Sequence, residues 1–467
     1  MTERKYAIYD SETSGPRPRY DQIFQLAGIL TDDSFAQVDQ LNIRARRLPY
    51  VLPGPKALEV TNIDPYSLDS PEHYSPYEFA VEVHETFQRW APAVFLGYNS
   101  IDFDEEIVRQ MFWSNLLHPY ITNTKGSMRA DLLIMMRAYS ACQPGAFVIP
   151  KNDEGKDSFR LEHIAPANGF ENMQAHDALG DIYATAFMAK VCQQASPELW
   201  EHLLKLCQPR GCDEILSAPT CKLVTHFGVS ETHLVTRLAS NPTNPKQVCV
   251  FDLSVDPTPY LNLSARQIAE RMRTDFRILR TVKTNSQPVL FHEGDKLAPE
   301  VTAEVTSGES NARLMAINDH PTFKIRVAEA LSIRASEFEA APHLEAKIYD
   351  GFPSRDDERL MREFHEAASW PQRKDIVARL QDSRMKQLGV RILMSEAPQV
   401  FDPAYRDKVK RGMLENRLMP PAEADLPWET FASARAGLAQ VDDPELRARI
   451  ETWLDEQEAA AQAVLAA

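Results

Sequence analysis

Two acidic residues stand at the end of the first apolar segment of the chain, residues 6–10. Asp10 is the last residue of this segment, and Glu12 lies two positions further on. Side chains at positions i and i+2 of a strand point to the same face, so both carboxylates lie on one side of this segment. Neighbouring carboxylates repel each other unless a cation or a proton lies between them, and hard divalent cations prefer oxygen ligands. The pair indicates either a metal site or a polar exit from the strand into the turn that begins at Thr13.

A second acidic group follows another apolar segment, residues 93–98. Asp104 stands at the beginning of a stretch with helical spacing of apolar residues, so it is either a metal ligand or the N-cap of that helix. Asp102 and Glu105 compete with Asp104 for the role of ligand.

A third group, His176 and Asp181, opens the helical stretch at residues 176–194. The two residues are five positions apart, so they converge only if His176 lies on the lead-in and Asp181 on the first full turn. A histidine that swings beside a metal-bound water is a suitable general base. The alternative is that His176 or Asp177 caps the helix and Asp181 is solvated.

The elements that position these groups follow from the apolar periodicity. We predict strands at residues 6–10, 23–31 and 93–98 and a helix at residues 77–90. Further helical segments are expected at about 104–118, 131–141, 158–168 and 176–194. Strands followed by helices that alternate with one more strand indicate an α/β domain over residues 1–195.

The remainder of the chain has a different composition. Short β-rich pieces at residues 222–225, 233–236, 248–251 and 288–291 predict a small barrel-like β domain with inserted helices over residues 196–344. A charged, helical pattern follows, with segments near 354–368, 371–394, 403–417 and 427–466. It predicts a C-terminal helical domain over residues 345–467.

The bulk properties limit the classes of function. A net charge of −16 and a pI near 5.3 argue against a protein that coats nucleic acid through its overall field, but they permit a local basic groove. No apolar run reaches the roughly 20 residues of a membrane span, and the charged N-terminus does not resemble a signal peptide. Cys207 and Cys212 have no matching second pair, so we expect reduced thiols, no zinc site and a cytoplasmic protein.

The three acidic groups, in this order, resemble the DEDDh exonuclease superfamily, whose fold is similar to ribonuclease H, a mixed sheet flanked by helices. Over its full length the chain resembles bacterial exonuclease I, and most closely over the first 195 residues. The resemblance lies in Asp10-Ser11-Glu12-Thr13, Leu96-Gly97-Tyr98-Asn99, Phe103-Asp104, Asp131-Leu132-Leu133, Ser158-Phe159-Arg160-Leu161-Glu162-His163, Ala167-Asn168-Gly169 and Ala175-His176-Asp177-Ala178. Weaker matches are Phe251-Asp252-Leu253, Pro288-Val289-Leu290, Tyr349-Asp350-Gly351-Phe352 and Asp382-Ser383-Arg384.

This resemblance implies an exonuclease domain, an SH3-like β domain and a helical domain. The implied activity is 3′→5′ hydrolysis of single-stranded DNA to 5′-mononucleotides, in DNA repair and recombination, with two Mg²⁺ ions for which Mn²⁺ substitutes. The implied metal ligands are Asp10, Glu12, Asp104 and Asp181, with His176 as the base. Glu12 and Arg160 are expected to contact the substrate. The implied partner is single-strand DNA-binding protein, through its acidic C-terminal tail, and we expect a monomer.

Two residues depart from the better-known members of the family. Ser14 stands where we expect an aromatic residue, and Asp102 where we expect a basic one. Both departures bear on how the terminal nucleotide is held, and neither removes a metal ligand.

A single strand must reach the metals through a channel of basic and aromatic side chains. Arg160 is the preferred channel residue, because an arginine beside the third motif has few apolar reasons to be there. Tyr98 and Phe103 are expected in the core rather than on bases. The other channel candidates are Arg129, Arg137, Arg406, Lys408, Lys410 and Arg411.

Three other functions remain open at this point. A DEDDh exoribonuclease or proofreading exonuclease would share the catalytic residues but would not need the two further domains. A catalytically silent nucleic-acid-binding scaffold would be expected to lack a carboxylate, and none is missing. A phosphoesterase for small nucleotides would be separated by its dependence on substrate length.

Overall fold

The computed structural model describes residues 4–171, 178–337, 341–420 and 426–466. The chain divides into two compact units, each of which is discontinuous in sequence. Unit 1 comprises Met1–Ser127, Asn172–Tyr183 and Ala341–Ala467, and unit 2 comprises Met128–Glu171 and Ala184–Ala340. Among the described helices, none is long and apolar enough to cross a membrane. All six cysteines are free thiols, as we expected from their spacing.

Unit 1 is built on a mixed sheet in the strand order β3-β2-β1-β4. The strands are β1 (Tyr6–Thr13), β2 (Ile23–Thr31), β3 (Gln37–Arg44) and β4 (Val94–Gly97). β1 pairs antiparallel with β2 and parallel with β4, so it lies in the interior of the sheet. The predicted strands at 6–10, 23–31 and 93–98 are confirmed, whereas β3 was not predicted, because most of its side chains are exposed and polar.

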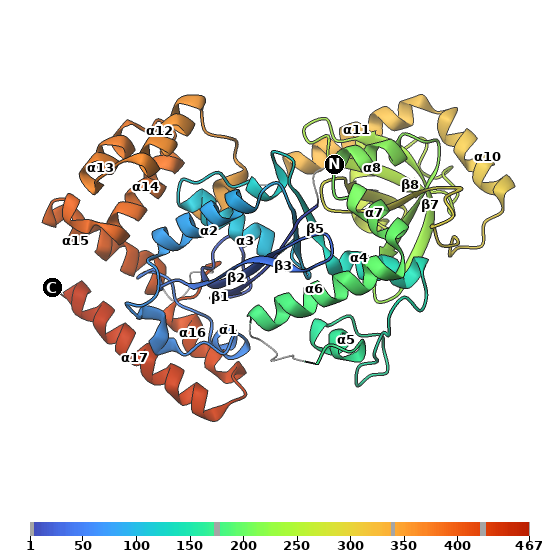
Figure 1. Cartoon of the computed structure of the whole chain (residues 1–467). Coiled ribbons are helices and arrows are strands. Elements are labelled where there is room, and N and C mark those ends of the chain that lie inside the picture. Colours follow the sequence, from blue (N-terminus) through green and yellow to red (C-terminus); the bar gives the residue numbers. More distant parts are fainter. Residues whose placement is uncertain (1–3, 172–177, 338–340, 421–425, 467) are drawn as a thin grey trace. The chain divides into compact units, whose positions relative to one another are not determined.

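Helices cover both faces of this sheet (Figure 1). One face packs on α2 (Pro76–Trp90) and α3 (Asp104–Ser114) through a core that includes Tyr9, Leu26, Phe87 and Phe112. A second core joins Phe24 of β2 to the C-terminal helices. The other helices with residues in unit 1 are α1 (Pro55–Val60), α6 (Ala178–Ala195, which begins in this unit), α12 (Arg355–Glu366), α13 (Trp370–Arg379), α14 (Ser383–Glu396), α15 (Pro403–Met413), α16 (Phe431–Gly437) and α17 (Pro444–Ala466).

Two of the predicted C-terminal helices are each divided in two. The segment predicted at 371–394 breaks between α13 and α14, where the Asp382 side chain accepts a hydrogen bond from the Arg384 backbone N–H and caps the new helix. The segment predicted at 427–466 breaks before Pro444, which is the first residue of α17. Proline is favoured at the first helical position because its missing N–H would have no partner there.

Unit 2 contains an antiparallel sheet in the order β10-β6-β7-β8-β9. Its core packs Phe251 and Leu253 against α9 and α11, and β9 is the one strand of this sheet that was not predicted. The strands are β6 (Cys221–His226), β7 (Ser230–Ser240), β8 (Gln247–Asp252), β9 (Leu279–Lys283) and β10 (Val289–His292). The other elements of this unit are β5 (Met128–Asp131), α4 (Leu132–Cys142), α5 (Leu161–Ala167), α7 (Pro197–Lys205), α8 (Pro209–Leu216), α9 (Ala265–Thr274), α10 (Ser307–Asn318) and α11 (Pro321–Ser336).

Candidate active site

The end of β1 carries the first two acidic residues of the site. Asp10 and Glu12 are half-buried and alternate with the buried Ser11 and Thr13, as expected for one face of a strand. The pairing of β1 with β4 is recorded for Tyr6, Ala7 and Ile8, so Asp10 and Glu12 lie beyond the part of β1 that β4 covers. The chain leaves β4 at this end of the sheet and turns into α3.

Asp104 is held against β1 by a side chain of the strand itself. The Ser11 hydroxyl donates a hydrogen bond of 2.5 Å to Asp104 Oδ1, and Asp104 is only 5% exposed. α3 begins at Asp104 and its N-cap position is Phe103, so the alternative that Asp104 is the N-cap is wrong. The alternation of side chains along β1 predicts that Ser11 faces away from Asp10, but it does not reveal the contact with Asp104.

The two residues that competed with Asp104 are placed differently. Glu105 is buried and accepts hydrogen bonds from the Tyr9 hydroxyl at 2.7 Å and the Thr122 hydroxyl at 2.9 Å. Asp102 is exposed. Asp104 is therefore the carboxylate of this group that faces the strand end, while Glu105 anchors α3 to the sheet.

Four carboxylates act on one another electrostatically in this region. Burial raises the pKa of Asp10 well above its usual range, and the charges of Asp104, Glu12 and Asp181 raise it further. The carboxylates come from β1, from the first turn of α3 and from the first turn of α6. Mutual repulsion of this kind is relieved by a proton or a cation.

The donor set fits a hard divalent cation, because it consists of carboxylate oxygens. Among the described residues, no group of three or more histidine, cysteine or acidic side chains is arranged so that it could hold a metal ion. The carboxylates that act on Asp10 concentrate negative charge, and a bound cation would balance that charge. His176 and Asp177 lie outside the described residues. Asp181 is half-buried in the first turn of α6 rather than fully solvated.

The predicted channel residues differ in how exposed their side chains are and in the contacts that they already make within the chain. Arg160 precedes α5 in unit 2, and its side chain is 74% exposed. Its Nη1 lies 3.5 Å from Glu162 Oε1. Arg129 is buried and donates to the Asn285 carbonyl at 2.8 Å, so it stabilises unit 2 and is not a channel residue. Arg137 is half-buried, and Arg411 donates to the Leu465 carbonyl in unit 1. All four members of the basic α15 group are half-buried or exposed: Arg406, Lys408, Lys410 and Arg411.

The expectation that Tyr98 and Phe103 are core residues is wrong, because both are half-buried. They flank the β4–α3 turn, where the chain reverses and leaves side chains partly open.

Ser14 has a structural role. It is fully buried, and its hydroxyl donates to Asp21 Oδ1 at 2.9 Å and accepts from the Gln22 backbone N–H at 3.0 Å. A side chain at Gly15 would place its Cβ 2.7 Å from Asp21, so the loop after β1 is closely packed. Ser14 is thus matched to its surroundings, which have no room for an aromatic ring in this conformation.

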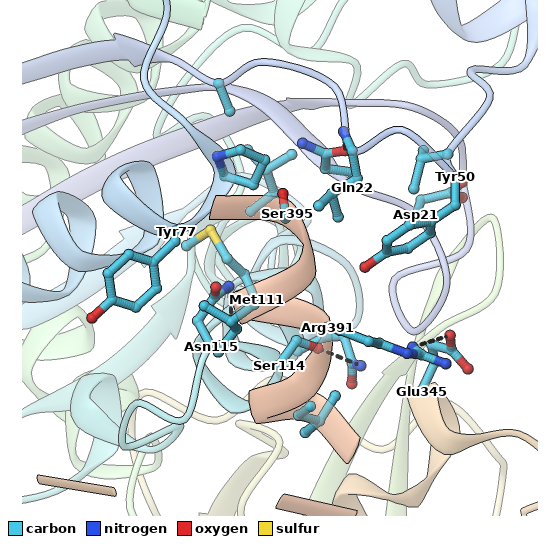
Figure 2. A pocket seen from close by; sticks show the side chains of 18 of the residues that line it. Asp21, Gln22, Tyr50, Tyr77, Met111, Ser114, Asn115, Glu345, Arg391 and Ser395 are labelled. Carbon is cyan, nitrogen blue, oxygen red and sulfur yellow. Dashed lines mark hydrogen bonds and ion pairs between the residues drawn. The ribbon is translucent and has the colours of Figure 1, made fainter. Parts of the chain in front are cut away.

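A cavity of about 110 Å³ lies within unit 1 beside α3 and α14. Figure 2 shows the Tyr50 hydroxyl pointing into the cavity and Arg391 reaching Glu345 at one end of it. Arg391 Nη1 lies 2.6 Å from Glu345 Oε1, and Arg417 contacts the same oxygen. Burial alone would raise the pKa of Glu345, but the charges of Arg417 and Arg391 outweigh it and lower the pKa to about 2. Sequence reasoning missed this ion cluster, because its members share no local motif.

Comparison with known proteins relates both units to nucleases. Residues 7–188 match the Exonuclease family (RNase_T), and residues 226–308 match the Exonuclease I SH3-like domain. Exodeoxyribonuclease I of Escherichia coli K12 is 31% identical over 375 residues, which cover 76% of this chain and 78% of that protein. Exodeoxyribonuclease I of Haemophilus influenzae is 30% identical over 375 residues, which cover 76% of this chain and 79% of that protein.

Solved structures agree with these matches. Exonuclease I from Methylocaldum szegediense has a TM-score of 0.85 and 25% identity, covering 99% of this chain and 100% of that one. E. coli exonuclease I in complex with a dA16 oligonucleotide has a TM-score of 0.83 and 26% identity, with the same coverage.

The sheet, the carboxylates and the family match define an exonuclease of the ribonuclease H-like fold. The SH3-like match and the relatives narrow this class. The chain belongs to the exonuclease I family, the 3′→5′ exodeoxyribonucleases that degrade single-stranded DNA. The predicted α/β exonuclease fold, SH3-like β region and helical C-terminal region are confirmed, whereas the boundaries at residues 195 and 344 stay predictions. The exonuclease family of the first match is typically metal-dependent, and the E. coli enzyme–DNA complex has also been solved in a metal-free form.

Proposed function

We propose that the chain removes nucleotides one at a time from the 3′ end of single-stranded DNA, with two Mg²⁺ ions held by Asp10, Glu12, Asp104 and Asp181. The observation that carries this proposal is the convergence of three carboxylates, Glu12, Asp104 and Asp181, on Asp10, whose pKa is raised by burial and then by these three charges. A site that concentrates negative charge in this way repels a phosphodiester, which is itself anionic, and a bound cation would offset that repulsion.

The side chains of this chain have separate tasks in the reaction. Asp10, on which the other three charges act, would be a ligand of the bound ions, and Ser11 fixes the orientation of Asp104 through its hydrogen bond. Glu12 and Arg160 contact the terminal nucleotide, and His176 accepts the proton of the attacking water. Bound at these carboxylates, the ions would supply activation of the water and neutralisation of the charge that develops on the departing 3′ oxygen. Mn²⁺ is expected to replace Mg²⁺, because it accepts the same oxygen ligands.

The test compares matched, 5′-labelled single-stranded DNA, duplex DNA and single-stranded RNA, each with Mg²⁺ and with EDTA. We expect stepwise shortening from the 3′ end of the single-stranded DNA alone, release of 5′-mononucleotides, and complete loss of activity in EDTA. Preference for RNA would move the protein to the exoribonuclease branch. Equal hydrolysis of free dinucleotides and long strands would instead support a small-nucleotide phosphoesterase, and hydrolysis that persists in EDTA would contradict the metal site.

A protein partner is also proposed, the acidic C-terminal tail of single-strand DNA-binding protein. The support is similarity to a solved SSB/exonuclease I structure in complex with the inhibitor CFAM, which has a TM-score of 0.81 and 25% identity to this chain. We expect a labelled tail peptide to bind the monomeric cytoplasmic enzyme, and binding to weaken as salt is added, because exposed ion pairs are screened. A scrambled peptide of the same charge is the control. Equal affinity for both peptides would contradict a specific site.

A further inference from the structure

The cavity of about 110 Å³ in unit 1 ends at an unbalanced group of buried charges. Arg391 and Arg417 contact the same oxygen of Glu345, so two guanidiniums share one carboxylate. Among the described residues, neither arginine forms an ion pair with a second acidic side chain. Glu345 and Arg417 are each only 8% exposed. One positive charge therefore remains without a counter-charge at this end of the cavity.

Hydrogen-bond donors beside these charges are open to the cavity. The Tyr50 hydroxyl points into it (Figure 2) and has no hydrogen-bond partner in the described part of the chain. Burial raises the pKa of Tyr50, so the hydroxyl keeps its proton at neutral pH and can donate. Arg391 uses Nη1 for Glu345, and 26% of its side chain is exposed. Because an arginine carries five N–H donors, further donors of Arg391 remain for a ligand.

Two other carboxylates line the cavity, but they do not balance this charge. Within the described residues, neither Asp21 nor Glu396 forms an ion pair with the two guanidiniums. Asp21 accepts a hydrogen bond from the Ser14 hydroxyl at 2.9 Å, and Glu396 accepts one from the Tyr77 backbone N–H at 3.4 Å. A buried charge is costly unless it is paired, so this end of the cavity favours an anion from outside the chain.

The remaining walls select the kind of anion. Away from the arginines they are mainly apolar, formed by Ile23, Val51, Met111, Leu388 and Ile392. A phosphate brings a charge of about −1.5 to −2 and three acceptor oxygens, more than one unbalanced guanidinium and one hydroxyl satisfy. A carboxylate brings a single charge and is attached to an apolar body, which such walls accept. An apolar cavity of about 150 Å³ holds one benzene ring, so about 110 Å³ admits a body of about three or four carbon atoms.

We propose that this cavity is a binding site for a small organic monocarboxylate with an apolar body. The carboxylate accepts hydrogen bonds from the Tyr50 hydroxyl and from Arg391, and its charge balances the second guanidinium. The body lies against the apolar side chains of β2, α3 and α14. The ligand thus contacts segments from both ends of the chain, which together form unit 1, so its binding stabilises that unit. No DNA or metal takes part, so the site is independent of the proposed nuclease activity.

The test measures the binding of isobutyrate to the full chain by isothermal titration calorimetry, in EDTA, without DNA and at constant ionic strength. Isobutyramide is the neutral ligand of matched shape, and Tyr405→Phe is the control for Tyr50→Phe. Tyr405 is an exposed tyrosine of unit 1, but it lies on α15 and does not line the cavity. We expect isobutyrate to bind and isobutyramide not to bind. Tyr50→Phe should raise the Kd for isobutyrate about fivefold or more, and Tyr405→Phe should leave it unchanged.

Glu345→Gln is expected to change the affinity in the opposite direction. It removes the carboxylate that the two guanidiniums share, so the positive charge at the cavity increases. The Kd for isobutyrate should therefore fall about fivefold or more. For the same reason isobutyrate should raise the unfolding temperature of Glu345→Gln by more than that of the wild type. If Glu345→Gln does not fold, Tyr50→Phe decides alone.

Three outcomes would overturn the site. Equal binding of isobutyramide would show that the cavity takes an apolar body without a charge. Tighter binding of inorganic phosphate than of isobutyrate would assign the cavity to another class of anion. No heat of binding and an unchanged unfolding temperature at about 50 mM isobutyrate would show that the cavity holds solvent only.

Discussion

Replacing Asp181 with alanine is expected to lower kcat by about a thousandfold or more, which corresponds to roughly 4 kcal/mol of lost transition-state stabilisation. Asp181 is one of the three charges that raise the pKa of Asp10, and its removal takes one carboxylate from the proposed metal site. The affinity for single-stranded DNA should remain close to that of the wild type, because strand binding depends on other side chains. Single-turnover hydrolysis with Mg²⁺ and anisotropy titration measure the two quantities separately.

Asp102→Ala is the matched control for this substitution. Asp102 is an exposed carboxylate beside the same site and does not belong to the group that acts on Asp10. At saturating DNA its single-turnover rate should stay close to that of the wild type, because Asp102 bears on how the terminal nucleotide is held and not on the metal site. His176→Ala is a useful companion, because loss of a general base costs about 10²- to 10⁴-fold while the carboxylates remain. Wild-type turnover in Asp181→Ala, or a loss in Asp102→Ala as large as that in Asp181→Ala, would contradict the ligand assignment.

The second large effect is expected on stability, from Glu345→Gln. Glu345 is 8% exposed and its carboxylate neutralises both Arg391 and Arg417, of which Arg417 also stacks on Trp428 at 4.3 Å. Removing one member of a buried ion cluster leaves the other charges uncompensated, and the cost is about 3–5 kcal/mol. Equilibrium unfolding in urea should show a lower midpoint. Glu154→Gln removes an exposed partner of Lys156 and should leave the midpoint unchanged.

The effect of Glu345 also has a defined dependence on pH. Its pKa in the folded chain is about 2, below the ordinary value of 4.5. The stabilisation is therefore fully present above about pH 4.5 and is lost as the pH falls towards 2, when the carboxylate takes up a proton in both states. The difference in unfolding free energy between wild type and Glu345→Gln should narrow over this interval. The ion cluster would not stabilise unit 1 if the difference in unfolding free energy between wild type and Glu345→Gln stayed constant with pH. The same would follow if the urea midpoint of Glu345→Gln equalled that of the wild type at neutral pH.

The sequence predicts the parts of the site that depend on short-range pattern. Asp10 and Glu12 follow from the alternation of a strand, and the helix that begins at Asp104 follows from apolar spacing. The contact of Ser11 with Asp104 joins residues 93 positions apart, and no local pattern encodes it. The cluster of Glu345 and Arg417 spans 72 positions and was missed for the same reason.

The errors in the fold have similar causes. β3 lies at an edge and exposes most of its side chains, so it lacks the apolar alternation that marks a strand. The breaks before Ser383 and Pro444 occur within long stretches of helix-forming residues, where capping by single residues decides the boundary. Local composition does not show where such a stretch divides.

The discontinuity of unit 1 has a consequence for how the chain is made. Phe24, Leu52 and Leu58 emerge from the ribosome early, but the residues that cover them, such as Leu414 and Trp453, come near the end of the chain. At a synthesis rate of about 5–20 residues per second, these early apolar residues stay without their packing partners for on the order of tens of seconds. Unit 2 is translated in that interval, so it can reach its final form first. Until the C-terminal helices are synthesised, the apolar face of the unit 1 sheet that they cover is therefore expected to be shielded by chaperones or to collapse late.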